Sequence, residues 1–138
     1  MRTIDSLIIH CTATPRGRHV TVADVDSWHR AQGYDSIGYH YLVYLDGSVH
    51  DGRPEAKVGA HCRGHNSRSI GIAYVGGVEA DGSPADTRTP AQVEALRGCV
   101  AGLLERYPAA RVYGHRDFAA KACPCFDARA EYGALLHL

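Results

Sequence analysis

Two histidines and one cysteine stand where predicted strands give way to loops. His10 ends an apolar run, His115 follows a shorter run, and Cys123 comes eight residues later in a proline-containing loop. Ends of adjacent strands can bring together residues that are distant in sequence. Two histidines and one cysteine would leave a fourth position on zinc for water, as in catalytic rather than structural sites. Spacing alone leaves a second interpretation open, in which each histidine is an ordinary polar residue at a strand end.

Runs of apolar and turn-forming residues predict the elements that would position these side chains. Thr21 with Asp24, and Thr89 with Gln92, form capping-box starts of helices, the second with Pro90 at its first position. The patterns predict helices over 21–33, 89–107 and 127–136. They predict strands over 4–11, 37–45, 48–50, 58–61, 69–75 and 111–113. Loops are expected over 12–20, 62–68, 76–88 and 114–126.

The order of these elements predicts an α/β fold with a central mixed β-sheet flanked by helices. A length of 138 residues fits one domain, and we expect residues 1–138 to form a single domain. Trp28 and Cys99, both in predicted helices, are expected to pack in the core.

The charge balance argues against polyanion binding. Lysine and arginine number 15, as do aspartate and glutamate, so we expect neither nucleic acid nor a membrane as partner.

The five cysteines are an odd number, and the apolar run at 7–9 is too short for a secretion signal. We therefore expect reduced thiols and synthesis in a cytoplasm, and we expect a monomer.

Four local sequences occur in a fixed order along most of the chain. They are IIHCTAT around His10, GYHYLVYLDG around Tyr39, GAHCRGHNSRSIGIAYVGG in the middle, and GHRDF with KACPCF near the end. Together, from about Ile4 to Phe126, they resemble the family of zinc amidases that includes N-acetylmuramoyl-L-alanine amidases and peptidoglycan recognition proteins. Among these, the short single-domain amidases of the T-odd coliphages are the most similar.

The resemblance implies a site and an activity. The zinc ligands of the family fall on His10, His115 and Cys123, the active-site tyrosine falls on Tyr39, and the phage-type lysine falls on Lys121. The implied reaction is hydrolysis of the amide between N-acetylmuramic acid and L-alanine in peptidoglycan, with one catalytic Zn²⁺. The implied setting is a phage or prophage endolysin that acts on the cell wall after release. A wall-recycling amidase and a secreted toxin are alternatives.

The residue types fit that chemistry. Zinc can lower the pKa of bound water to about 7, which supplies hydroxide at neutral pH. The resulting oxyanion needs a positive or hydrogen-bonding partner, and the motif places Lys121 to supply one. Tyr39 could orient the water or transfer a proton. The sequence does not assign these two roles between Tyr39 and Lys121.

The loop that the resemblance places in the cleft wall holds His61 and Asn66. We expect them to contact substrate or to support the metal site, and a turn role is equally open for Asn66. Cys125 is a departure from the pattern, since phage relatives carry serine there. A small buried residue is the default interpretation of Cys125. Competition with Cys123 for zinc, or a disulfide with it, is an alternative.

Two different interpretations compete with the amidase. Cys62, His65, Cys123 and Cys125 could together form a structural zinc knuckle, although Cys-x-Cys is not a usual spacing for one. A protein of this fold could also act without lysis, by binding peptidoglycan or by inhibiting an RNA polymerase. The complete ligand set disfavours a binding-only protein, and nothing in the sequence bears on the polymerase.

Overall fold

The computed structural model describes residues 2–133 and residue 135. Within them, a five-stranded mixed sheet has the strand order β4-β3-β5-β1-β7, and a two-stranded sheet joins β2 to β6. The helices are α1 Val22–Ala31, α2 Pro90–Arg106 and α3 Ala128–Gly133, with short 3-10 turns at Asn66–Arg68 and His115–Asp117. The strands are β1 Ser6–Cys11, β2 Thr14–Pro15, β3 Tyr41–Val43, β4 Val49–Asp51, β5 Ser69–Tyr74, β6 Gly77–Val78 and β7 Arg111–Gly114. This single domain confirms the predicted α/β class.

The central strands are parallel, and only the edge strand β4 runs antiparallel to its neighbour β3. Strand β1 lies between β5 and β7, so it is paired along both sides. All six of its residues and all six of β5 are buried. Strands covered on both faces of a sheet carry near-continuous apolar runs, which is why residues 4–11 and 69–75 are recognisable in the sequence.

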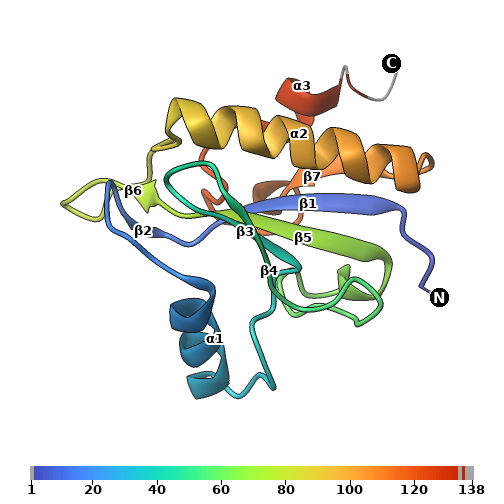
Figure 1. Cartoon of the computed structure of the whole chain (residues 1–138), viewed down its shortest axis with the longest axis horizontal. Coiled ribbons are helices and arrows are strands. Elements are labelled where there is room, and N and C mark those ends of the chain that lie inside the picture. Colours follow the sequence, from blue (N-terminus) through green and yellow to red (C-terminus); the bar gives the residue numbers. More distant parts are fainter. Residues whose placement is uncertain (1, 134, 136–138) are drawn as a thin grey trace.

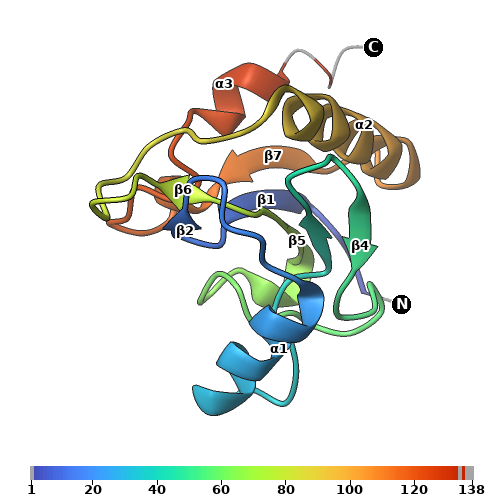
Figure 2. The same cartoon turned by 60° about the vertical axis from the view of Figure 1, so that its left-hand side comes forward.

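Helices cover both faces of the sheet. Helices α2 and α3 lie on one face and α1 lies on the other (Figures 1 and 2). The larger core lies beneath α2, where Leu96, Val100 and Leu103 pack against the odd-numbered residues of β1. A smaller core beneath α1 includes Val25 and Leu42. Because side chains alternate along a strand, the even-numbered residues of β1 face the side of α1.

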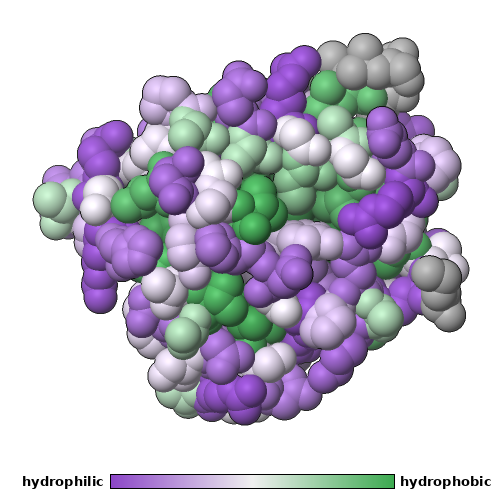
Figure 3. Space-filling view, viewed as in Figure 1, coloured by the Kyte–Doolittle hydropathy of each residue, from purple (hydrophilic) through white to green (hydrophobic). Residues whose placement is uncertain are grey.

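The surface differs from these two cores. On the face seen in Figure 3, hydrophilic residues cover most of the rim, and hydrophobic residues show between them towards the middle. Among the residues described, no helix is long and apolar enough to cross a membrane.

Capping explains where the two longer helices begin. Both predicted capping boxes are present: Thr21 accepts from the backbone N–H of Asp24 and Asp24 accepts from that of Thr21, while Thr89 and Gln92 do the same. These pairs satisfy backbone N–H groups that have no partner within a helix.

Two predicted strands differ from the structure. No strand forms at 58–61, because the backbone groups of this segment are used in hydrogen bonds that do not belong to a β-sheet. Ala60 donates to the Gly38 carbonyl, and the Val58 carbonyl accepts from the Arg53 guanidinium. The strand predicted at 37–45 is reduced to β3, because the carbonyls of Gly38 and Tyr39 are used by Ala60 and Arg53.

Other element boundaries also shift. Strand β6 forms inside the predicted loop 76–88, pairing with β2 over two residues, which is too short for a hydropathy pattern. The last helix occupies 128–133, within the predicted 127–136; positions 134 and 136 lie outside the described residues.

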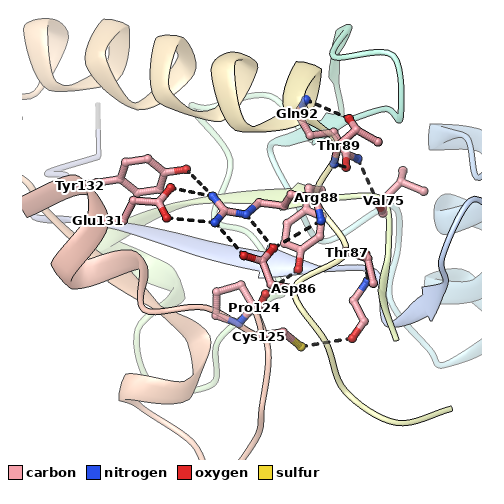
Figure 4. A network of polar contacts seen from close by, with 12 residues as sticks. Val75, Asp86, Thr87, Arg88, Thr89, Gln92, Pro124, Cys125, Glu131 and Tyr132 are labelled. Atoms are coloured by element: carbon pink, nitrogen blue, oxygen red, sulfur yellow. Dashed lines mark hydrogen bonds and ion pairs between the residues drawn. The ribbon is translucent and has the colours of Figure 1, made fainter. Parts of the chain in front are cut away.

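One buried arginine ties the C-terminal segment to the rest of the domain (Figure 4). The Arg88 guanidinium donates to both carboxylate oxygens of Asp86 and of Glu131, and to the Tyr132 hydroxyl. It also lies 3.4 Å from the ring centre of Phe126. The side chain of Arg88 is only 6% exposed, so these contacts replace the water that it loses on burial. They hold α3, and the chain that leads into it, against the loop before α2.

Candidate metal centre

Two histidines meet because their strands are neighbours. His10 is the fifth residue of β1, and His115 directly follows β7, which pairs with β1 in parallel with Ile9 opposite Gly114. Both histidines therefore reach the same carboxyl edge of the sheet. Their ring centroids are 4.7 Å apart.

The third member of the cluster comes from the loop before α3. The Cys123 sulfur lies 3.9 Å from Nδ1 of His10 and accepts a hydrogen bond from the backbone N–H of Cys11 at 3.2 Å. The Cys123 carbonyl accepts from the backbone N–H of Arg116, which holds the loop next to His115. One ligand atom from each of His10, His115 and Cys123 lies within 4.8 Å of the other two.

Burial and hydrogen bonding set the protonation of this cluster. Burial lowers the pKa of His10 far below its usual range, with the neighbouring His61 and His115 adding to the effect. Hydrogen bonds from Cys11 lower the pKa of the Cys123 thiol and outweigh the opposing effect of burial. Metals bind neutral imidazole and thiolate, so the environment favours the ligand forms of both residues.

Tyr39 lies beside His10, with 5.2 Å between the ring centroids. The segment before it is held by the backbone N–H of Gly38, which donates to Nδ1 of His29 at 2.8 Å. Burial raises the pKa of Tyr39 far above its usual range, so the phenol keeps its proton at neutral pH. Tyr39 can thus donate a hydrogen bond next to the cluster.

Lys121 is exposed and lies at the mouth of the site. Burial lowers the pKa of His115, and the charge of Lys121 lowers it further. Lys121 therefore adds a positive charge beside the cluster without being buried itself.

The cluster lies in a groove built from two cavities of about 480 and 370 Å³. The two cavities share five lining residues: Tyr34, Ala60, His61, His115 and Lys121. One side of the cluster therefore stays open to an extended ligand.

His61 and Asn66 differ in what they do. Asn66 lines the groove, but its side-chain oxygen accepts from the backbone N–H groups of His61 and Cys62 at 3.0 and 2.9 Å, which is the turn role left open in the sequence. His61 is 9% exposed, and its Nδ1 lies 2.8 Å from Nε2 of His10. Its closest polar contact is thus with a member of the metal cluster.

Trp28 corrects a sequence-based expectation. It is expected in the core, but the residue is 37% exposed and lines the groove. Only Val25 is fully buried in this helix. Val22 also packs against the smaller core, whereas Trp28 does not belong to it. The hydropathy pattern does not reveal which apolar residues of the helix face the core.

The remaining cysteines do not form the alternative knuckle. Among residues 2–133 and 135, the only cluster of potential metal ligands is His10, His115 and Cys123. Cys62 is buried, and the Cys125 thiol donates to the Gly77 carbonyl at 3.2 Å. Cys125 is thus a small, half-buried residue, and Cys99 packs against the larger core.

A three-ligand cluster, open on one side to a groove at the carboxyl edge of the sheet, is the arrangement of a metal-dependent hydrolase. A family model described as N-acetylmuramoyl-L-alanine amidase matches residues 1–126. The endolysin of Klebsiella phage KP32 is 42% identical over 121 residues, which cover 88% of this chain and 80% of that protein. The endolysin of Escherichia phage T7 is 41% identical over 123 residues, which cover 89% of this chain and 82% of that protein.

A solved structure agrees with these sequence matches. The N-acetylmuramoyl-L-alanine amidase LysC from Clostridium intestinale URNW superposes with a TM-score of 0.82 at 28% identity, over 97% of this chain and 86% of that chain. The chain belongs to the N-acetylmuramoyl-L-alanine amidase family.

Proposed function

We propose that this protein is an endolysin that hydrolyses the amide between N-acetylmuramic acid and L-alanine in peptidoglycan, with one zinc ion held by His10, His115 and Cys123. The observation that carries the proposal is the open cluster of these three side chains in a member of this amidase family.

The donor set supports zinc as the metal. Zn–N and Zn–S bonds at a tetrahedral angle separate their donor atoms by about 3.5 Å. The 3.9 Å between Nδ1 of His10 and the Cys123 sulfur is close to that separation. Imidazole and thiolate are ligands that zinc accepts, whereas magnesium and calcium prefer oxygen.

The side chains around the cluster suit amide hydrolysis. Zinc bound there supplies Lewis acidity, which activates water and polarises a carbonyl at neutral pH. Lys121 offers a positive charge to the oxygen that becomes negative when the amide carbonyl is attacked. Tyr39, protonated and beside His10, offers a hydrogen-bond donor that orients the attacking water or the carbonyl.

The setting is part of the proposal. The curated relatives at about 40% identity are phage endolysins. We infer that the chain is made in the cytoplasm of an infected bacterium and acts on the wall after release.

Defined muropeptides test the reaction. The purified protein is incubated with them, with and without a chelator, and the products are identified by mass spectrometry. We expect free stem peptide with an N-terminal L-alanine, lost on chelation and restored by zinc. Cleavage between sugars would overturn the assigned bond, and intact muropeptide in the presence of bound zinc would overturn the enzymatic role in favour of binding alone.

A further inference from the structure

A second buried histidine stands directly behind the metal cluster. His10 and His61 are 1% and 9% exposed, and Nε2 of His10 lies 2.8 Å from Nδ1 of His61. The two rings meet edge to face, with an interplanar angle of 89°. Such a short contact between two neutral imidazoles requires one nitrogen to carry the hydrogen and the other to accept it.

The direction of this bond follows from the other nitrogen of His10. Nδ1 of His10 faces the Cys123 sulfur, so it is the nitrogen that would bind the metal, and for that it would carry no hydrogen. Nε2 of His10 then carries the hydrogen and donates it to Nδ1 of His61. The hydrogen of His61 is consequently on Nε2, which lies 3.3 Å from the hydroxyl oxygen of the fully buried Ser69.

The surrounding backbone is shaped to hold the His61 ring. A Cβ added at Gly71 would lie 2.6 Å from this ring, and one at Gly59 would lie 2.7 Å from it. Any side chain at either position would therefore displace the ring. Asn66 fixes the backbone of His61 through the N–H groups of residues 61 and 62. The glycines at 59 and 71 thus leave the space that the ring fills, and Asn66 holds the backbone that carries it.

We propose that His61 is a positioning residue, and not a substrate contact: with Ser69 it holds His10 in the Nε2–H tautomer and in the orientation that presents Nδ1 to the metal. The proposal rests on the ligand set of the proposed function. Outer-shell partners of metal-binding histidines fix the tautomer and ring orientation, and their loss costs roughly 10–100-fold in metal affinity or activity.

Two substitutions at one position test the proposal. His61→Ala removes the acceptor, so we expect zinc affinity, measured by competition with a chromogenic chelator, to fall by roughly 10–100-fold. His61→Asn places an amide oxygen near the position of Nδ1, and we expect it to regain most of that affinity. His65→Asn is the matched control in the same loop, where the ring stacks on Phe118, and we expect it to bind zinc as the wild type does.

A second measurement is independent of zinc. In the metal-free wild-type protein, ¹⁵N chemical shifts of the imidazoles should show His10 with its hydrogen on Nε2, and His61→Ala should lose that preference. Hydrogen on Nδ1 of His10 in the wild type would overturn the proposal. So would wild-type zinc affinity in His61→Ala, particularly if KM alone rises, since that is the behaviour of a substrate contact.

These readouts separate this proposal from the proposed function. If the wild type fails to bind zinc, the metal assignment is wrong, and the tautomer of His10 still decides whether His61 orients it. If zinc binds and the affinities follow the expected order, the positioning role is supported whichever bond the enzyme cuts.

Discussion

For single residues, the position of a side chain at a strand end decides whether it reaches the groove and the other members of the cluster. His10 alternates with Ile9 and Cys11, which pack in the core beneath α2, so its ring faces the groove. His115 reaches the same edge because β7 pairs with β1 in parallel. Parallel pairing thus turns a sequence separation of 105 residues into a ring-to-ring contact of 4.7 Å.

Removing the thiolate tests the cluster. Cys123→Ala should weaken zinc binding by more than the roughly 10–100-fold expected of an outer-shell change, because it deletes a proposed ligand. The fold should remain, since the backbone at this position is held by the Arg116 N–H. Zinc content by mass spectrometry and circular dichroism measure the two effects. Stoichiometric zinc in a folded Cys123→Ala protein would show that the ligand set is wrong.

Tyr39→Phe separates chemistry from metal binding. The substitution keeps the ring that lies beside His10 and removes only the hydroxyl, so zinc affinity should be unchanged. We expect kcat to fall by about 10²–10⁴-fold, the range for loss of a proton-transferring group. Steady-state kinetics with zinc-loaded protein measure this. A near-normal rate would remove Tyr39 from the mechanism.

At the scale of elements, the loop that carries Cys123 depends on contacts on its far side. The Pro124 carbonyl accepts from the Tyr74 hydroxyl of β5 at 2.6 Å, and the Cys125 thiol bonds to the Gly77 carbonyl of β6. Beyond them, Arg88 joins Asp86 to α3 (Figure 4). Cys123, the proposed metal ligand, is therefore positioned by β5, by β6 and by the arginine network together.

Arg88→Met tests the contribution of that network to stability. Methionine retains much of the apolar volume and removes every ionic contact. Because the carboxylate partners are partly exposed and can be rehydrated, we expect a loss of about 2–4 kcal/mol in the free energy of unfolding, near or below the range for a fully buried pair. Urea unfolding measures it. Arg16→Met is the control, since its ion pair with Glu79 is exposed and its loss should change stability far less than the loss of the Arg88 contacts.

The same network predicts a dependence on pH. Burial raises the pKa of Asp86, but the hydrogen bonds and the charge of Arg88 outweigh burial and lower this pKa below 3.8. Hydrogen bonds from Arg88 likewise lower the pKa of Glu131 below 4.5. A carboxyl group whose pKa is lower in the folded than in the unfolded protein stabilises the fold at pH values above its unfolded-state pKa. This stabilisation is lost as the pH falls through its folded-state pKa. The wild type should lose stability below about pH 4.5, and Arg88→Met should lose less. Equal slopes of unfolding free energy against pH in the two proteins would contradict this.

Across the whole molecule, the elements that could be predicted from the sequence are those marked by a local pattern of residues. Strand β1 and helix α2 were predicted to within two residues, because an apolar run marks a strand buried on both faces and a capping box marks a helix start. The positions of His10 and His115 at strand ends were also predictable, and the structure brings both together with Cys123. Strand-end position alone did not mark them as ligands; that prediction came from the resemblance to the amidase family. Strands β2 and β6 could not be predicted, because a strand of two residues is too short to show an alternation of apolar and polar residues.

The rest of the site depends on tertiary contacts that leave no local pattern. The bond between His61 and His10 spans 51 residues and requires two glycines to leave room for a ring. The exposure of Trp28 depends on how α1 rests against the sheet. Neither can be read from spacing or hydropathy.

Titration of metal-free protein with zinc tests whether His10, His115 and Cys123 form a catalytic metal site. Release of stem peptide from a defined muropeptide is followed as zinc is added, for the wild type and for Cys123→Ala. We predict that the rate of the wild type rises in proportion to bound zinc and reaches its plateau at one ion per chain, whereas Cys123→Ala stays inactive at the same zinc concentrations. Full release of stem peptide by the metal-free wild type, or by Cys123→Ala without bound zinc, would contradict a catalytic site formed by His10, His115 and Cys123.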